Sequence, residues 1–143
     1  MRILVVTGPN LNLLGQREPD HYGRVTLDTI HSSLDARARE TGHSIETFQS
    51  NHEGALIDCL QNHMNHIDGA ILNAGGLTHS SVSLRDTVAL VEYPVIEVHI
   101  SNIFAREEFR HHSYISPVAH GIIAGFGWKS YLLGLEALIG EEK

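Results

Sequence analysis

The amino-acid sequence predicts an α/β fold, in which five parallel strands form one sheet with helices on both faces. Short apolar runs rich in β-branched residues alternate along the chain with segments whose apolar residues recur at helical spacing. The short runs lack polar and apolar alternation, which is typical of parallel strands buried on both faces. No linker, repeat or run of charge divides the 143 residues. We therefore expect a single domain over residues 1–143.

The first half of the chain supplies two strand–helix units. A β-branched apolar run predicts a strand over 2–6, which a Gly-Pro pair ends. A helix is predicted over 26–41, with Gly42 as its C-terminal stop. The apolar face of this helix consists of Leu27, Ile30, Leu34 and Ala38. The second unit is a strand over 44–49 and a helix over 53–66, whose apolar stripe contains Leu56, Leu60 and Met64.

The second half continues the alternation. We expect a strand over 69–72, a helix over 80–92 that Ser80 caps, and a strand over 94–100. The remaining elements are a helical turn at 106–109, a strand at 121–126 and a helix at 128–139. In such sheets, ligands bind beyond the carboxyl ends of the strands. The prediction is that function lies in the segments after the first, third and fourth strands.

Composition excludes several classes of function. Ten Lys and Arg against seventeen Asp and Glu give a net charge of −7, which argues against partners that need a basic face, nucleic acid and anionic membrane surfaces. No apolar run approaches the roughly 18 residues of a membrane span, and no signal peptide is evident, so we expect a cytoplasmic protein. The single cysteine, Cys59, excludes an intrachain disulfide. The two lysines, Lys129 and Lys143, make Schiff-base chemistry improbable.

The connection after the first strand, residues 8–23, is longer than the roughly two to six residues usual between a strand and a helix. Long connections of this kind are often active-site lids, and this one carries Arg17 and Tyr22. A solvated surface loop is the alternative from length alone. The segment lacks the glycine-rich phosphate pattern of P-loops and dinucleotide folds, so a nucleotide role is disfavoured.

Two further segments carry candidate functional residues. The third strand runs into Asn73, two glycines and the start of a helix, where free backbone N–H groups favour a carboxylate or phosphate. In the fourth strand, Glu97 and His99 are two residues apart and share a face, so the carboxylate can orient the imidazole and raise its basicity. Arg106 and Arg110 follow, four apart on one expected helical face; a surface ion pair is the alternative role for them.

Metal binding is not indicated by the eleven histidines. His63 and His66 have a helical spacing that could place two ligands together, but no third ligand is evident. His31, His43, His52 and His120 form no constellation, and His111 and His112 point to different sides of their segment. The sequence therefore predicts no metal site.

Three segments together resemble one known family, the type II 3-dehydroquinate dehydratases. The segments are GPNLNLLG-x-REP-x-x-YG at 8–23, NAGGLTHSSVSLRD at 73–86 and EVHISNIFAREEFR at 97–110. The similarity covers essentially the whole chain, in order and with the family's spacings. It implies that the single domain is a catalytic one with a flavodoxin-like fold.

The resemblance implies that 3-dehydroquinate is dehydrated to 3-dehydroshikimate by anti elimination of water through an enolate, without cofactor or metal. This reaction belongs to the shikimate pathway to chorismate and aromatic amino acids; whether the chain serves biosynthesis or quinate degradation stays open. The family's usual assembly is a homododecamer, a tetramer of trimers.

Catalytic roles follow from the resemblance, position by position. Tyr22 corresponds to the base that removes the C2 proton, and Arg17 to the residue that activates this tyrosine. His99, oriented by Glu97, corresponds to the acid that protonates the departing C1 hydroxyl. Asn10 corresponds to the residue that orders the water facing the enolate oxygen.

Substrate-binding roles follow in the same way. The expected binding set is Asn73, His79, Arg110 and the backbone of Ile100 and Ser101. Asp86 corresponds to a residue that reaches a neighbouring subunit's site across the trimer interface, and Arg106 to a residue that supports the lid.

The competing hypothesis is a non-catalytic flavodoxin-like module that binds a nucleotide or acts as a receiver. A receiver needs clustered acidic residues after the first strand and a lysine after the fifth, but this chain has Gly8-Pro9-Asn10 and Gly125-Phe126-Gly127 there. A flavodoxin needs a Thr- and Ser-rich phosphate loop after the first strand, which is also missing. Both features favour the enzyme.

Overall fold

The computed structural model describes residues 1–16, 19–22 and 24–140, with Pro19 and Tyr22 described in their backbones alone. Five parallel strands form one sheet in the order β2-β1-β3-β4-β5. The strands are β1 (Arg2–Thr7), β2 (Ser44–Gln49), β3 (Gly69–Asn73), β4 (Val95–His99) and β5 (Gly121–Ala124). This arrangement confirms the predicted α/β fold class with a parallel sheet.

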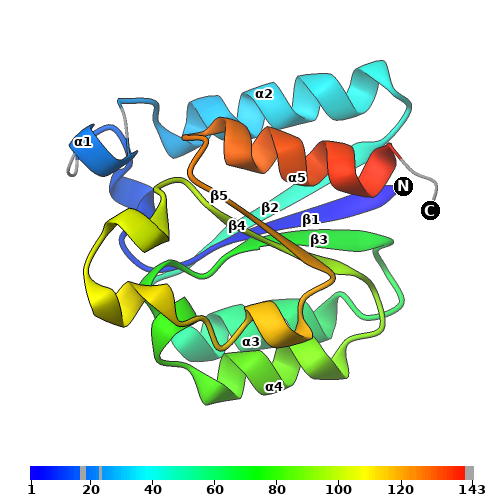
Figure 1. Ribbon diagram of the computed structural model, residues 1–143. Helices are drawn as coiled ribbons and strands as arrows, with labels where there is room; N and C mark the ends of the chain where they lie inside the picture. Colours follow the sequence, from blue (N-terminus) through cyan, green and yellow to red (C-terminus); the bar gives the residue numbers. More distant parts are fainter. Residues whose placement is uncertain (17–18, 23, 141–143) are drawn as a thin grey trace.

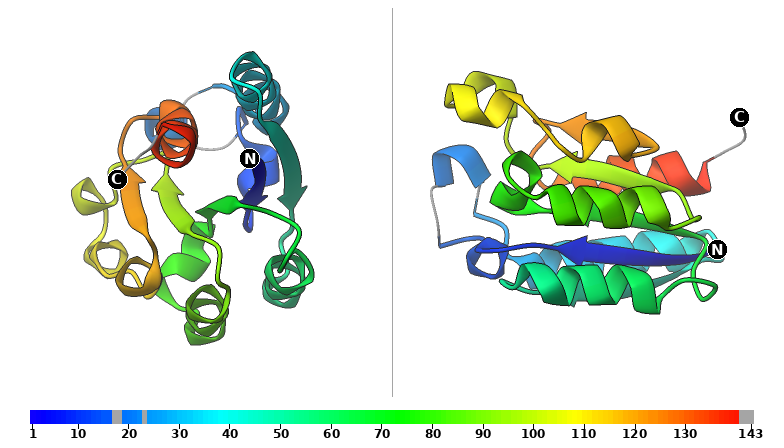
Figure 2. Two further views of the ribbon diagram at one scale, coloured as in Figure 1. Left: turned by 90° about the vertical axis from the view of Figure 1, so that its right-hand side faces the viewer. Right: turned by 90° about the horizontal axis from the view of Figure 1, so that it is seen from below.

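Helices cover both faces of the sheet, which makes three layers (Figure 1; Figure 2, left). The α-helices are α1 (Pro19–Tyr22), α2 (Leu27–Glu40), α3 (Glu53–Asn62), α4 (Val82–Leu90) and α5 (Lys129–Ile139). Within the described residues, the short 3-10 helices are η1 (Leu11–Leu13), η2 (Gly75–His79), η3 (Ile103–Ala105), η4 (Glu108–His111) and η5 (Ser116–Val118). Helices α2 and α5 pack on one face of the sheet, and α3 and α4 on the other (Figure 1).

Two apolar clusters, one on each face of the sheet, form the core. Ile3 and Val5 point into the cluster that α2 and α5 cover, whereas Leu4 and Val6 point into the cluster that α3 and α4 cover. Successive strand residues point to opposite faces, so a strand covered on both sides needs apolar residues at every position. This is why the sequence of β1 shows an unbroken apolar run.

Three predicted helices have different bounds in the structure, and the strand expected over 121–126 ends at Ala124. Helix α4 begins at Val82 and is capped by Ser81, which accepts a hydrogen bond from the Leu84 N–H at 2.9 Å, whereas Ser80 only ends η2. Helix α3 ends at Asn62 instead of residue 66, and the left-handed φ of 70° at Asn65 is incompatible with a helix that continues to residue 66. The helical turn expected at 106–109 is η4 (Glu108–His111), and Arg106 has extended backbone before it.

The carboxyl ends of β1, β3 and β4 meet at the edge of the sheet opposite the N-terminus (Figure 1). Gly8 lets the first two of these segments approach, because a Cβ at this position would lie 2.6 Å from the Ala74 carbonyl oxygen. The predicted functional segments therefore converge at this edge.

Among the described helices, none combines the length and apolar character needed to cross a bilayer.

Candidate active site

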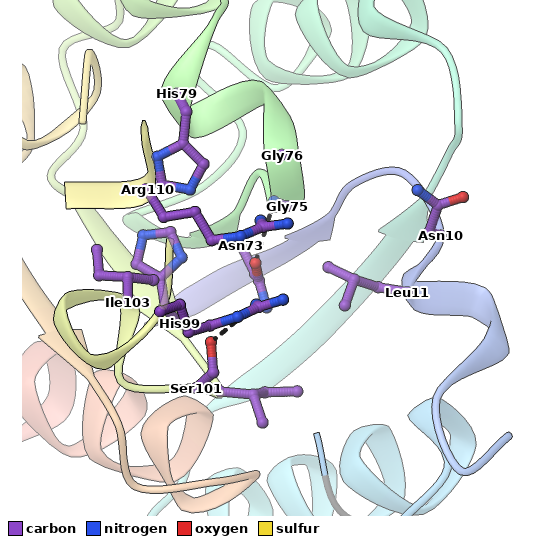
Figure 3. Close-up of a pocket in the computed structure, with 12 residues that line it drawn as sticks. Asn10, Leu11, Asn73, Gly75, Gly76, His79, His99, Ser101, Ile103 and Arg110 are labelled. Carbon is purple, nitrogen blue, oxygen red and sulfur yellow. Dashed lines mark hydrogen bonds between the residues drawn. The ribbon is translucent and has the colours of Figure 1, made fainter. Parts of the chain in front are cut away.

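A cleft of about 120 Å³ lies at this edge of the sheet. The segments that follow β1, β3 and β4 all contribute to its lining, as the sequence predicts (Figure 3). The lining residues are Asn10, Leu11, Asn73, Gly75, Gly76, His79, His99, Ile100, Ser101, Ile103, Arg106 and Arg110. Predicted residues that are far apart in the chain therefore surround one cleft.

The C-terminal end of β4 supplies a buried acid–base pair. Glu97 is 1% exposed and His99 is 5% exposed, and the His99 Nε2 atom donates to the Glu97 Oε2 atom at 2.5 Å. His99 lines the cleft, and among the described residues its other ring nitrogen, Nδ1, has no hydrogen-bond partner. The predicted orientation of His99 by Glu97 is present, and Nδ1 is the atom that can exchange a proton with a ligand.

Two serines from the turn before β5 complete the surroundings of Glu97. The Ser113 hydroxyl donates to Oε2 at 2.9 Å, and the Ser116 hydroxyl donates to Oε1 at 2.5 Å. Burial raises the pKa of the Glu97 carboxyl, but the hydrogen bond and charge of His99 and the two serine donors outweigh it. The net effect lowers the pKa of Glu97 below its ordinary value, which keeps a carboxylate next to His99.

His79 forms a second imidazole wall of the cleft. Its ring stacks at 6.3 Å from the His99 ring, and its Nδ1 atom donates to the His112 carbonyl oxygen at 2.9 Å. Burial is the largest of the effects that lower the pKa of His79, and the nearby positive charges of His99 and Arg110 act in the same direction. A neutral His79 whose Nδ1 carries the hydrogen presents Nε2 as a hydrogen-bond acceptor.

Two arginines bring positive charge to the cleft. Arg110 donates from Nε to Glu107 at 2.9 Å, and Arg106 donates from Nη1 to the Ser101 hydroxyl at 3.3 Å (Figure 3). The expectation that both arginines share one helical face was wrong, because Arg106 precedes η4 in extended backbone. Both still line the cleft, so the site can attract an anion.

Asn73 and Gly75 shape the floor of the cleft. Asn73, the last residue of β3, is 3% exposed, and its Oδ1 atom accepts from the Gly75 N–H at 3.1 Å. Gly75 has a φ of +60°, and a Cβ there would lie 3.1 Å from the Pro9 carbonyl oxygen. Glycine is required at this turn because an L side chain would be strained and crowded.

The segment after β1 is held by residues at the end of β2 and just after it. Asn10 has a left-handed φ of 71°, and its N–H donates to the Asn51 Oδ1 atom at 2.9 Å. Gln49 donates from Nε2 to the Gly8 carbonyl oxygen at 3.1 Å. These contacts place Asn10 on the wall of the cleft opposite His99 (Figure 3).

Four predicted residues are not among the described residues that line the cleft, and one of them, Glu97, lies behind His99. Arg17 lies outside the described residues, and of Tyr22 the structure describes the backbone alone, as the last residue of α1. Asp86 is exposed on α4 and does not line this chain's own cleft. Its predicted role in a neighbouring subunit's site therefore remains a prediction.

The sequence analysis missed the residues that hydrogen-bond to site residues without lining the cleft themselves. Ser113, Ser116, Asn51 and Tyr131 contact site residues but belong to segments without a recognisable catalytic pattern. Tyr131 lies within the predicted helix over 128–139, but nothing in its sequence pattern sets it apart from the other residues of that helix. No group of three or more His, Cys, Asp or Glu side chains within the described part of the chain is arranged to hold a metal ion.

Comparisons with known proteins point to one family. The family model described as dehydroquinase class II matches residues 1–139. A curated 3-dehydroquinate dehydratase of Roseiflexus castenholzii is 56% identical over 98% of this chain and 89% of its own length.

Solved structures agree with the sequence comparison. A type II dehydroquinase of Butyrivibrio crossotus has a TM-score of 0.95 at 43% identity, covering 96% of this chain and 97% of its own. A type II dehydroquinase of Propionibacterium acnes has a TM-score of 0.94 at 39% identity, covering 98% and 97%. The family model extends over the three segments that build the cleft, and the high TM-scores show that the fold is shared. The chain belongs to the class II dehydroquinase family.

Proposed function

We propose that this protein is a type II 3-dehydroquinate dehydratase, a hydro-lyase that converts 3-dehydroquinate to 3-dehydroshikimate and water. The observation that carries the proposal is the buried Glu97–His99 pair opening into a cleft with cationic walls, in a chain of this family. The substrate is a carboxylate with several hydroxyl groups, which suits a small polar cleft. The non-catalytic alternative has no support from the comparisons.

The proposed reaction begins at the lid segment. Tyr22, as a phenolate, removes the C2 proton, and the electron pair moves into the C3 carbonyl to form an enolate. A free tyrosine has a pKa of about 10, and a nearby cation lowers a pKa by about 1 to 3. Arg17 is the cation assigned to this task. Asn10, on the cleft wall, is proposed to order a water next to the enolate oxygen.

The second step uses β4. The enolate collapses, the C1–O bond breaks, and His99 protonates the departing hydroxyl so that water leaves. Glu97 supports this role because a carboxylate stabilises the protonated ring and fixes which nitrogen faces the cleft. Tyr22 takes up one proton, His99 gives one, and the substrate loses its hydroxyl as water, so the proposed reaction needs no cofactor.

Substrate binding is assigned to the rest of the cleft. Asn73 and His79 offer a donor and an acceptor respectively, Arg110 offers a positive charge, and the backbone at Ile100 and Ser101 is proposed to hold the carboxylate. Arg106, which contacts Ser101, is proposed to support the lid.

The proposed setting is a cytoplasmic homododecamer, a tetramer of trimers, in which Asp86 completes a neighbour's site. The exposed face of α4 supports a subunit contact. Val82 and Leu90 are 54% and 58% exposed, and they lie four residues before and after Asp86, on the same side of the helix. Exposed apolar side chains suit a contact between subunits, and the acidic residue between them would then reach the neighbouring subunit.

Turnover of 3-dehydroquinate tests the proposed function directly. Mixing purified protein with this compound should generate the ultraviolet absorbance of a conjugated enone carboxylate. Tyr22→Phe should reduce the rate by about 10² to 10⁴-fold, the range that positioned acid–base catalysis contributes. Tyr93→Phe is the matched control, because Tyr93 lies away from the cleft and donates to the Leu60 carbonyl.

No absorbance change with the wild-type protein would overturn the proposed activity. Near wild-type turnover by Tyr22→Phe would overturn the assignment of the base while leaving the activity intact.

A further inference from the structure

We propose that Tyr131 is a positioning residue, whose hydroxyl fixes the orientation of the Asn73 amide so that one Asn73 N–H faces the substrate. Tyr131 lies in the first turn of α5 and does not line the cleft. The inference rests on the proposed function for what the amide binds, but the orientation itself follows from contacts within this chain.

The Asn73 amide is held at both ends. A backbone N–H can only donate, so the amide atom that faces the Gly75 N–H at 3.1 Å must be the oxygen. The amide nitrogen then faces the Tyr131 hydroxyl at 3.1 Å and donates one hydrogen to it. Among the described residues, the second hydrogen has no partner. Since Asn73 lines the cleft, this hydrogen is the one a ligand can use.

The hydroxyl of Tyr131 links the ends of two neighbouring strands. Thr7 is the last residue of β1 and is the register partner of Asn73, the last residue of β3. The Thr7 hydroxyl lies 3.0 Å from the Tyr131 hydroxyl. Because the tyrosine accepts from Asn73, its own hydrogen is free to go to Thr7. With Thr7 as the acceptor of that hydrogen, the hydroxyl acts toward Asn73 as an acceptor and holds the amide in the orientation that the Gly75 N–H requires.

The surroundings of Tyr131 make this arrangement rigid. Its side chain is fully buried in the cluster between the sheet and α2 with α5. Burial raises the pKa of Tyr131 to about 12, against smaller opposing effects of the hydrogen bonds with Thr7 and Asn73. The hydroxyl thus stays neutral over the pH range of an enzyme assay. Removing it should alter the position of the Asn73 amide without changing the pKa values seen in the pH profile.

Tyr131→Phe removes the acceptor and keeps the ring in the core. We expect kcat/KM for 3-dehydroquinate to fall by about 10- to 100-fold, the range for a misplaced positioning group. The loss should appear mainly as a higher KM, with the midpoints of the pH profile unchanged. The matched control is Tyr93→Phe, which also removes one buried hydroxyl that donates a hydrogen bond, to the Leu60 carbonyl oxygen at 2.6 Å, and it should leave kcat/KM near wild type.

A double-substitution cycle separates positioning from general stability. In an Asn73→Ala background, Tyr131→Phe should cause little further loss of kcat/KM, because the group that it positions is already gone. If Tyr131 had only a general structural role, the fold-losses in kcat/KM from Tyr131→Phe and Asn73→Ala would multiply in the double variant. Fully multiplied losses, or an unchanged kcat/KM in Tyr131→Phe itself, would overturn the proposal.

Thr7→Val keeps the test decisive if Tyr131→Phe does not fold. This substitution takes away the acceptor of the tyrosine hydrogen, which then favours donation to a flipped Asn73 oxygen. A fall in kcat/KM is expected, and wild-type values would contradict the proposal. If the wild type does not convert 3-dehydroquinate, the proposed function fails, and neutron diffraction still decides the inference because it locates the amide hydrogens, which X-ray structures at ordinary resolution do not show. The Asn73 amide must keep one orientation in the wild type and lose it in the variant.

Discussion

At the scale of single residues, the site is built from side chains whose hydrogen-bonding states are set by their neighbours. Glu97 remains a buried carboxylate because His99, Ser113 and Ser116 all donate to it. Burying a carboxylate without hydrogen-bond donors would cost free energy. The three donors are therefore what allows Glu97 to be buried in its charged form. The chemistry assigned to His99 therefore depends on residues that never touch a substrate.

Glu97→Gln tests this dependence. The amide cannot stabilise a protonated imidazole, so we expect turnover to fall by about 10² to 10⁴-fold, with the fold retained. His99→Ala should cause a loss in the same range, and combining the two should add little because they act as one unit. Steady-state rates at neutral pH measure this. Full additivity of the two losses would contradict a coupled pair.

The same substitution has a consequence for acid stability. The pKa of Glu97 is lowered in the folded protein, so its contribution to stability is present above its unfolded-state pKa and is lost as the pH falls through the folded-state value. The unfolding free energy of the wild type should thus decline more steeply below about pH 4.3, the ordinary glutamate pKa, than that of Glu97→Gln. Urea unfolding at several pH values is the measurement.

At the scale of secondary-structure elements, the helix starts and strand ends decide where the functional side chains lie. Ser81, and not Ser80, caps α4, and it also donates to Glu53 at the start of α3. The preceding turn, η2, carries Gly75 and His79 into the cleft. A single cap therefore joins two helices and fixes where the segment after β3 ends.

Ser81→Ala should lower the free energy of unfolding by about 1 kcal/mol, the usual cost of losing a helix cap. Ser80→Ala is the matched control, since Ser80 is exposed and ends η2 through its backbone N–H, which the substitution keeps, and it should change stability little. Urea unfolding at one fixed protein concentration compares them. Equal effects of the two substitutions would show that the cap is not where the structure places it.

At the scale of the whole molecule, the open question is how copies of the chain assemble. Asp86 lies on the exposed face of α4, away from this chain's own cleft. A residue that serves a neighbour's site requires a closed symmetric assembly, because only then does every site receive one. The proposed dodecamer predicts a sedimenting particle of twelve chains.

Hybrid assemblies test the shared site. Asp86→Ala and Tyr22→Phe should each be nearly inactive alone. After dissociation and random reassembly at equal amounts, roughly one quarter of the sites should combine an intact Tyr22 with an intact Asp86 from the neighbour, and activity should recover accordingly. Each variant reassembled with itself is the control. No recovery in verified hybrids, or full activity from a monomer, would rule out the shared site.

The sequence by itself determined the α/β class, the strand positions to within a few residues and the segments that form the cleft. It also placed Glu97 and His99 on one face, because the two-residue period of a strand is a local property. The fold class and the family are confirmed; the catalytic roles of the individual residues stay predictions.

Only the tertiary structure decided which residues outside the cleft hydrogen-bond to the site residues. Tyr131 contacts Asn73 across 58 positions of sequence, and Ser116 contacts Glu97 across 19. These contacts depend on the order of strands in the sheet and on how α5 packs against it. Local patterns carry no information about that packing, because a buried tyrosine on a helix has the same spacing whether its hydroxyl faces a carbonyl oxygen or an active-site amide.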